Sequence, residues 1–202
     1  RQRQMCIRDS FKAILESVNN DKNRIELASQ VIYIAAQNGH TAVVTALLEN
    51  GAEINKANNG FTPLYTAATE GYKDVVKTLL QNGATTSFLG IRVGNKECKE
   101  YIKKVKKCHQ QLKRIVSGLD KNPSCLSRVS SEVTLEDFLN DMDQDIKDAV
   151  LNMQDSGGNI LAHAVRNNKA EEYKILKESG AKDDITVRYK SKGFTYKRSM
   201  TE

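Results

Sequence analysis

Side chains that could do chemistry are few in this sequence, and they are widely separated. The chain has three histidines, His40, His109 and His163, and histidine is the side chain most often used as a general acid or base. Cys108 directly precedes His109, but adjacent residues of a helix point about 100° apart, which suits a nucleophile and its base poorly. No serine lies in a triad motif, and no glycine-rich stretch has the spacing of a phosphate-binding loop. The sequence therefore predicts a non-enzymatic protein with no catalytic residue, no metal site and no cofactor.

Composition restricts the class of protein further. The four cysteines have no CxxC spacing, which favours reduced thiols and an intracellular, cytoplasmic location over a disulfide or zinc framework. No apolar run reaches the length of a membrane span, and no secretory signal is visible. Hydrophobic residues make up 39% of the chain and aromatic residues 6%, with no tryptophan. These values favour a stack of helices over a β-rich core.

The elements that would position a site are organised around residues 60–84, GFTPLYTAATEGYKDVVKTLLQNGA. Thr62 is a good N-cap, and Pro63 suits the first position of a helix. Gly71 can end this helix in the left-handed conformation, and an apolar stripe follows at helical spacing. Residues 28–52, ASQVIYIAAQNGHTAVVTALLENGA, repeat the pattern without a gap at an offset of 32. Two helix pairs this thin must stack to bury a core.

These two segments resemble the ankyrin-repeat family, whose unit of about 33 residues is a β-turn followed by two helices with a T-P-L-H-x-A signature. The signature stands here as residues 62–67, TPLYTA, with Tyr65 in place of the histidine. Residues 157–181 return to the pattern at an offset of 97 from 60–84, with Asn168 in place of the glycine between the helices. Residues 88–105 resemble the closing half of a truncated repeat. The interval between Gly51 and Gly60 is one residue shorter than is usual in the family, which predicts a distorted turn.

The resemblance implies a site for a protein partner, because ankyrin stacks bind proteins with their β-turn tips and the exposed face of their first helices. Carried onto this sequence position by position, the predicted partner-binding residues are Asn58, Asn59, Phe61, Thr69, Glu70, Gln37 and Asn38. Ser29 corresponds to Phe61 in the earlier repeat, and Ser156, Gly158, Arg166 and Asn167 are the equivalents in the late one. The resemblance also implies that the His40 ring hydrogen-bonds to backbone in the turn between helices.

Two charged segments separate the repeats. Residues 95–121 contain nine Lys or Arg against three acidic residues, whereas 132–155 contain one lysine against eight. Both segments have apolar residues at heptad spacing, so they predict two helices that form an antiparallel hairpin, with Thr134 capping the acidic one. The apolar positions are Cys98, Tyr101, Val105, Cys108, Leu112, Ile115 and Leu119 in the first helix, and Leu135, Leu139, Met142, Ile146, Ala149 and Met153 in the second. An irregular acidic segment within 141–153 and two eroded repeats are alternatives.

Three partners are considered for these helices. Binding of a polyanion, nucleic acid or an anionic membrane, through the basic helix at 96–114 is one alternative function. The sequence does not favour nucleic acid, because Glu97 and Glu100 interrupt the lysines, Tyr101 belongs to the apolar seam, and an acidic helix is available for internal charge pairing. The heptad seams could also form a homodimer.

The first ten residues, RQRQMCIRDS, resemble the translation of a transposase-based sequencing adapter; a basic native N-terminus is the alternative. If the segment is non-native, the natural start is missing, and the chain could be the regulatory or targeting arm of a larger enzyme. The predicted organisation is a non-native segment at 1–10, ankyrin repeats at 11–105, a basic helix, linker and acidic helix at 106–154, a degenerate repeat at 155–184 and a flexible basic tail at 185–202. The sequence thus predicts an all-α ankyrin solenoid with a helical insertion, serving as a non-catalytic protein-interaction scaffold whose partner it does not name.

Overall fold

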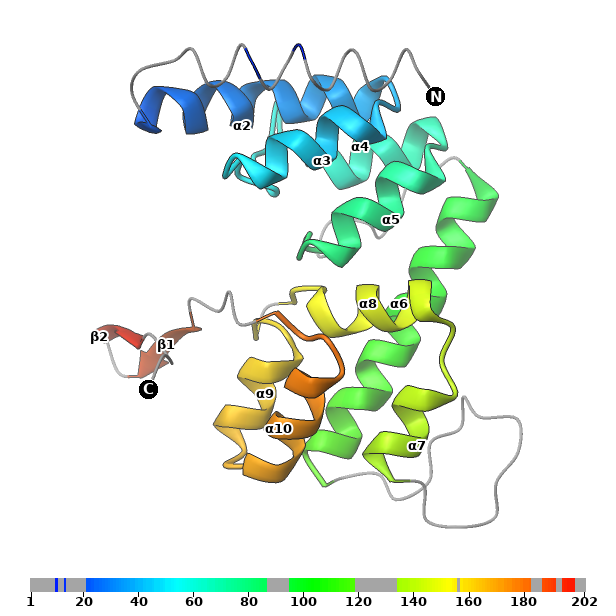
Figure 1. The fold of residues 1–202 in the computed structure, drawn as a ribbon, viewed down its shortest axis with the longest axis vertical. Helices are drawn as coiled ribbons and strands as arrows, with labels where there is room; N and C mark the ends of the chain where they lie inside the picture. The colour runs from blue at the N-terminus through cyan, green and yellow to red at the C-terminus, as the bar shows by residue number, and fades with distance from the viewer. Residues whose placement is uncertain are drawn as a thin grey trace. The chain divides into compact units, whose positions relative to one another are not determined.

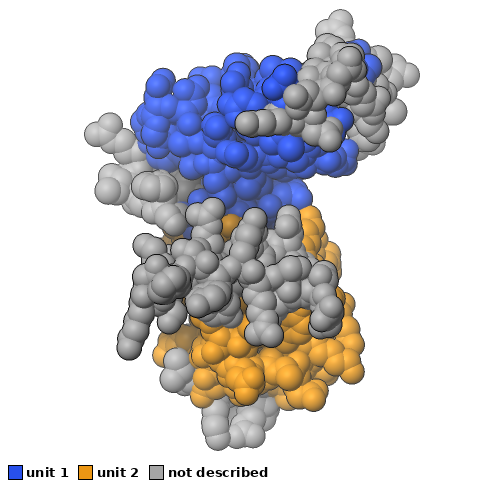
Figure 2. Space-filling view, turned by 90° about the vertical axis from the view of Figure 1, so that its left-hand side faces the viewer, with its two compact units in different colours: residues 1–102 blue, residues 103–202 orange. Residues whose placement is uncertain are grey.

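The computed structural model describes residues 10, 13, 21–86, 95–118, 134–155, 157–182, 187–191 and 194–198. These residues form helices and one small two-stranded sheet (Figure 1). The chain divides into two compact units, residues 1–102 and 103–202, which are coloured separately in Figure 2. The predicted segments 88–94 and 120–133, and all of 11–18 except Ala13, lie outside the described residues. Within the described ranges, no helix has the length and apolar character needed to cross a membrane.

The first unit contains two helix pairs. The first pair is α2 (Asp21–Gln37) and α3 (Thr41–Glu49), and the second pair is α4 (Pro63–Glu70) and α5 (Lys73–Gln81). Helix α2 packs on α3 and on α4, and α5 packs on α3 and on α4. The side chains at these contacts are small or aliphatic and fully buried: Ala28, Ile32, Ala36, Val44, Leu47, Leu64, Ala67, Ala68, Val76, Leu79 and Leu80. Each pair therefore buries its apolar side against the other, as the repeated pattern predicts.

Local signals place the ends of α4 where the sequence predicts them. The Thr62 hydroxyl accepts a hydrogen bond from the Tyr65 N–H at 3.2 Å, and Pro63 occupies the first helical position. Gly71 ends the helix with a φ of 91°, in the left-handed region.

Helix α2 begins earlier than the repeat predicts: it starts at Asp21, whereas the offset of 32 would start it near residue 31. Residues 21–30 contain no proline or glycine and no Thr-Pro start, so nothing breaks the helix there.

The turn before α4 is regular, although the short interval predicts distortion. Asn58 and Phe61 exchange two backbone hydrogen bonds of 2.9 and 3.0 Å. The two residues between them, Asn59 and Gly60, have φ values of 51° and 83°, which asparagine and glycine tolerate best. The missing residue thus shortens the connection without opening the turn.

Helix α6 (Lys96–Val116) is the long helix that the sequence predicts between the repeats. The Asn95 side chain caps it by accepting a hydrogen bond from the Cys98 N–H at 3.1 Å. The buried face contains Cys98, Ile102, Val105, Cys108, His109, Leu112 and Val116. Tyr101 and Ile115 were predicted on this face but are only half-buried. The buried positions Ile102 and Val116 share a heptad position with His109. Because His109 is polar, a search for apolar residues alone selects the adjacent positions Tyr101 and Ile115.

The predicted acidic helix is two helices. Thr134 and Asp137 form a capping box at the start of α7 (Leu135–Asn140), which confirms the predicted cap. The helix ends there, however, and α8 (Gln144–Asn152) begins after a break at residues 141–143. Helix α8 packs on α9 (Ile160–Arg166), which pairs with α10 (Ala170–Glu178). The expectation of one continuous helix over 134–153 is therefore wrong. Asp141 is the C-cap residue of α7 and Asp143 is the N-cap residue of α8, and aspartate favours helix ends over helix interiors.

Residues 155–182 have the same local geometry as residues 58–85. Asp155 and Gly158 form the backbone bridge seen between Asn58 and Phe61, and Asn159 caps α9 as Thr62 caps α4. Asn168 takes the place of Gly71 with a φ of 55°, as predicted. Even a long-range bond is repeated: Asn55 accepts from the Thr85 N–H and Asn152 from the Lys182 N–H, both at 2.9 Å.

The sequence predicts that the tail is flexible or forms a weak strand. The structure has two antiparallel strands there, β1 (Val187–Ser191) and β2 (Phe194–Arg198), with Val187 opposite Arg198 and Ser191 opposite Phe194.

Candidate functional site

The turn that precedes α4 presents an aromatic side chain to solvent. Asn58, Asn59 and Gly60 are all exposed, and Phe61 keeps 46% of its surface exposed. The Phe61 ring stacks on the ring of Tyr65, with centroids 4.9 Å apart and an angle of 22° between the planes. Phe61 precedes the N-cap residue Thr62 and Tyr65 lies in the first turn of α4, so the stack joins the turn to the start of the helix.

The remaining predicted binding residues lie at the ends of the first helices of the two pairs. Thr69 and Glu70 end α4, while Gln37 ends α2 and Asn38 follows it, and all four are exposed. The Thr69 hydroxyl donates to the Tyr65 carbonyl at 2.9 Å, and the Asn38 amide donates to the Ile34 carbonyl at 2.8 Å. The structure thus exposes the whole predicted set, here called the repeat surface: Asn58, Asn59, Phe61, Thr69, Glu70, Gln37 and Asn38.

Some equivalents of these residues do not belong to a surface. Ser29, which corresponds to Phe61, is 1% exposed, and its hydroxyl accepts a hydrogen bond from the Glu53 N–H at 2.9 Å and donates to the Ile25 carbonyl. In the late repeat Arg166 and Asn167 are exposed, Gly158 is half-buried, and Ser156 lies outside the described residues. At the two equivalent positions that the structure describes, Ser29 and Gly158, there is thus no aromatic side chain.

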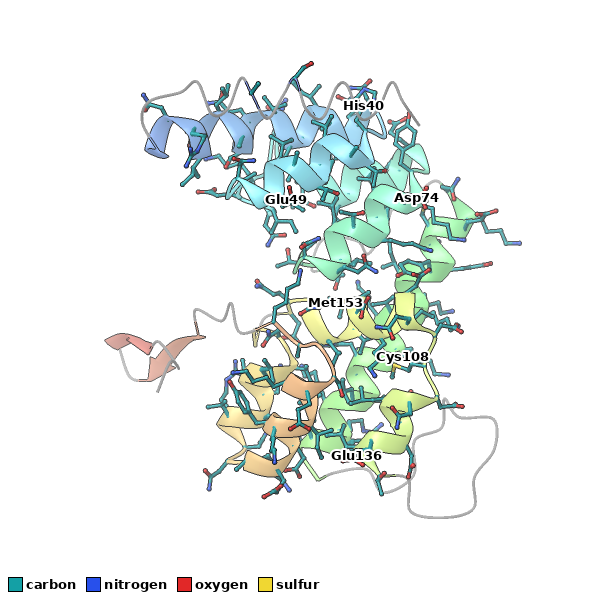
Figure 3. All side chains as sticks on the ribbon, in the orientation of Figure 1. His40, Glu49, Asp74, Cys108, Glu136 and Met153 are labelled. Atoms are coloured by element: carbon teal, nitrogen blue, oxygen red, sulfur yellow. The ribbon has the colours of Figure 1, made fainter. Side chains whose placement is uncertain are left out.

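The side chain of His40 does not cap the helix that follows it. It is the N-cap residue of α3, with no side-chain cap hydrogen bond, and it is exposed. Figure 3 labels it at the start of α3, and Asp74 at the corresponding start of α5. The expected hydrogen bond from its ring to that backbone does not form, and Tyr72 takes the equivalent N-cap position before α5.

The second unit contains a cluster that the sequence did not predict, built around the carboxylate of Asp155. Lys113 of α6 forms an ion pair with its Oδ2, and Nε2 of His109, also on α6, lies 3.7 Å from that oxygen. On the other side, His163 Nε2 of α9 lies 3.3 Å from Oδ1, which also accepts the Gly157 N–H at 2.6 Å. Three cationic or potentially cationic side chains from two helices thus converge on one carboxylate; they are here called the Asp155 cluster.

This environment controls the protonation of Asp155. Burial alone would raise the pKa of the carboxyl group, but the nearby His109 ring and the hydrogen bonds from His163, Lys113 and the Gly157 N–H outweigh it and hold the pKa well below its usual range. Asp155 is therefore ionised under all ordinary conditions. His109 Nδ1 lies 2.9 Å from the Val150 carbonyl oxygen, and because a carbonyl only accepts, this nitrogen carries a hydrogen.

The burial of the Asp155 cluster indicates a structural role. The His109 side chain is 2% exposed, so a substrate has no access to its ring. The sequence places His109 and His163 far apart, and only the fold brings both to Asp155. One sequence signal was available. Asp155 stands where the equivalent repeat has the neutral Asn58, at an offset of 97, and a carboxylate in place of an amide can form ion pairs.

Among the described residues, no group of three or more His, Cys, Asp or Glu side chains could hold a metal ion. Comparison with known families matches residues 4–88 to the family model described as ankyrin repeats (3 copies). A comparison with curated proteins gives no match. The matched range contains α2, α3, α4 and α5 and the whole repeat surface.

Proposed function

Because residues 4–88 belong to the ankyrin-repeat family, we propose that this chain is a non-catalytic scaffold that binds a protein partner through its repeat surface. Ankyrin repeats are in general protein-interaction modules. Each helix pair buries one side against its neighbour, so the opposite side is held rigid and remains available to a partner.

The observation that carries this proposal is the exposed Phe61 on its Tyr65 platform. Aromatic side chains are enriched at the centres of interfaces. Here the stack restrains Phe61 before any partner binds, so less side-chain entropy is lost on association. The polar residues around it, Asn58, Asn59 and Thr69, would form the rim of such an interface.

The repeat surface has no chemistry of its own to offer a substrate. Asparagine, glutamine and threonine side chains donate and accept hydrogen bonds but are not acids or bases at neutral pH. Glu70 is exposed at the end of α4, with no histidine, cysteine or lysine beside it on that helix. Recognition by shape and hydrogen bonding is what these residue types support.

The test is a quantitative affinity purification from cells that produce the protein. Proteins captured by the wild-type chain are compared with those captured by Phe61→Ala, Phe61→Tyr and Leu27→Ala, the last being a matched loss of an exposed hydrophobic side chain on α2. A true partner is retained by Phe61→Tyr and by Leu27→Ala and is lost with Phe61→Ala. Its purified form should then bind Phe61→Ala at least about tenfold more weakly, as expected for an interface anchor. A partner whose affinity is unchanged by Phe61→Ala would refute this surface as its binding site.

A further inference from the structure

A row of lysines runs along the solvent-facing side of α6. Lys96, Lys99, Lys103 and Lys107 are all exposed, and they follow one another at intervals of three, four and four residues. On a helix of 3.6 residues per turn these positions fall within about 80° of one another and extend over about 16 Å. The buried face of α6 lies on the opposite side of the helix. These four residues are here called the lysine row.

Internal pairing does not neutralise the lysine row. The sequence predicts that the acidic segment would pair with the basic one, and two lysines of α6 do so: Lys104 lies 3.3 Å from Asp143, and Lys113 pairs with Asp155. Both belong to the flanks of the helix. Within the part of the chain that the structure describes, the four lysines of the row make no ion pair or hydrogen bond.

One of the two acidic residues expected to disrupt a polyanion site is displaced from the row. Glu97 lies to one side of it, where its carboxylate is 3.8 Å from Lys73. Only Glu100 shares the exposed face with the four lysines. The row therefore has a net positive charge of about three, held in one line on a helix whose other side is fixed in a core.

We propose that the lysine row binds the phosphate backbone of duplex nucleic acid without reading its sequence. A duplex presents a phosphate about every 1.7 Å along its axis, so a row of about 16 Å meets several phosphates at once. Lysine is a flexible point charge that attracts phosphates without fixed geometry. Tyr101, the one aromatic residue of α6, is half-buried and off the row, so no ring is placed to stack on an unpaired base.

Two other anionic surfaces fit less well. An interfacial helix inserts an apolar face among lipid headgroups, but the apolar face of α6 is buried in the protein. An acidic protein segment would meet the row with fewer charges per unit length than a duplex does. The proposed function does not depend on this site, because the repeat surface lies on other elements.

The test is the salt dependence of binding to a fluorescein-labelled 20-base-pair DNA, followed by anisotropy between 50 and 200 mM NaCl. The probe is used in two unrelated sequences, with wild-type protein, with the quadruple variant Lys96→Gln, Lys99→Gln, Lys103→Gln and Lys107→Gln, and with a control that loses the same charge elsewhere. The control carries Lys56→Gln, Lys174→Gln, Lys177→Gln and Lys182→Gln. Far-UV circular dichroism confirms that each variant keeps its helix content.

Each phosphate contact contributes about 0.9 to the slope of log K against log salt for a duplex, so four contacts contribute about 3.6. The quadruple variant should lose a slope of about 3 to 4, while the control changes it little. The pair Lys103→Gln and Lys107→Gln alone should remove about half of that slope, which keeps the test decisive if the quadruple variant folds poorly. Both DNA sequences should bind alike.

Three results would overturn the proposal. One is an equal loss in the quadruple variant and the control, which would show an effect of net charge alone. Another is no binding of either DNA at 50 mM salt. The third is binding to vesicles containing phosphatidylserine, or to a glutamate-rich peptide, by a protein that does not bind the duplex.

Discussion

Replacing Asp155 by asparagine should destabilise the second unit markedly, because it removes the charge on which His109, Lys113 and His163 converge. Removing one partner of a fully buried ion pair costs about 3–5 kcal/mol. The Asp155 side chain is 23% exposed and that of Lys113 is 29% exposed, so water can replace part of what is lost. Asparagine can also still accept the Gly157 N–H. We therefore expect a loss of about 2–3 kcal/mol, which in a chain of this length lowers Tm by roughly 4–12 °C.

The assay must separate the two units, since a single melting curve can average them. Hydrogen–deuterium exchange with peptide resolution does this. Peptides covering α8 and α9 should exchange faster in Asp155→Asn than in the wild type, while peptides covering residues 21–86 should be unchanged. The matched control is Asp141→Asn, which makes the same chemical change at an exposed residue and should alter stability by less than about 0.5 kcal/mol.

Equal stability of Asp155→Asn and the wild type would refute the reasoning, because it would mean that the converging donors are fully hydrated or displaced in solution. So would an equal effect of Asp141→Asn, which would point to net charge rather than to the Asp155 cluster.

Three further predictions follow from single contacts. Because the pKa of Asp155 is depressed in the folded protein, its stabilising effect is complete above the unfolded-state pKa of about 4 and declines as the pH falls below that value. In urea denaturation, the difference in unfolding free energy between the wild type and Asp155→Asn should therefore shrink below about pH 4. Thr62→Ala removes the oxygen that accepts the Tyr65 N–H and should cost about 1 kcal/mol in thermal unfolding, whereas Thr62→Ser should cost little. Gly71→Ala should cost about 1–2 kcal/mol, because its φ is 91° and an added Cβ would lie 2.6 Å from Asn95 Nδ2; a Tm within 1 °C of the wild type would contradict this.

Features set by local interactions were predictable from the sequence. The cap at Thr62, the proline that follows it, the left-handed Gly71 and the capping box at Thr134 all act within a few residues, so the sequence alone located them. The assignment of residues 28–84 to ankyrin repeats is likewise confirmed by the match over residues 4–88, as is the predominantly helical fold.

Features that depend on tertiary contacts were not predictable in the same way. His109 occupies a buried position that looks polar in the sequence, because its partners, Val150 and Asp155, lie more than 40 residues away. The buried face of α6 was therefore assigned to Tyr101 and Ile115 in place of Ile102 and Val116. A buried polar residue is acceptable only where partners exist, and the sequence does not show where a distant loop will place them.

The candidate binding residues illustrate both cases. The position of Phe61 in the repeat predicts its exposure, whereas Tyr65 stands in the sequence only as a departure from the signature. Its stacking on Phe61 joins a residue of the turn to one in the first turn of α4, so helical periodicity alone does not reveal it. Ser29 was misplaced because α2 begins ten residues before the point that the offset implies, which puts Ser29 inside a packed helix.

The same turn geometry serves opposite purposes at Asn58 and Asp155. Both residues open a bridged turn before the first helix of a pair, and both lie 97 positions apart at equivalent points of the pattern. Asn58 is neutral and exposed, so its turn is open to solvent and carries the exposed Phe61. Asp155 is charged and held by side chains of α6 and α9, and the residue equivalent to Phe61 is Gly158, which has no side chain to offer. In the second unit, internal contacts thus hold the turn at Asp155, and we propose that recognition of a partner through a turn of this kind belongs to residues 58–61.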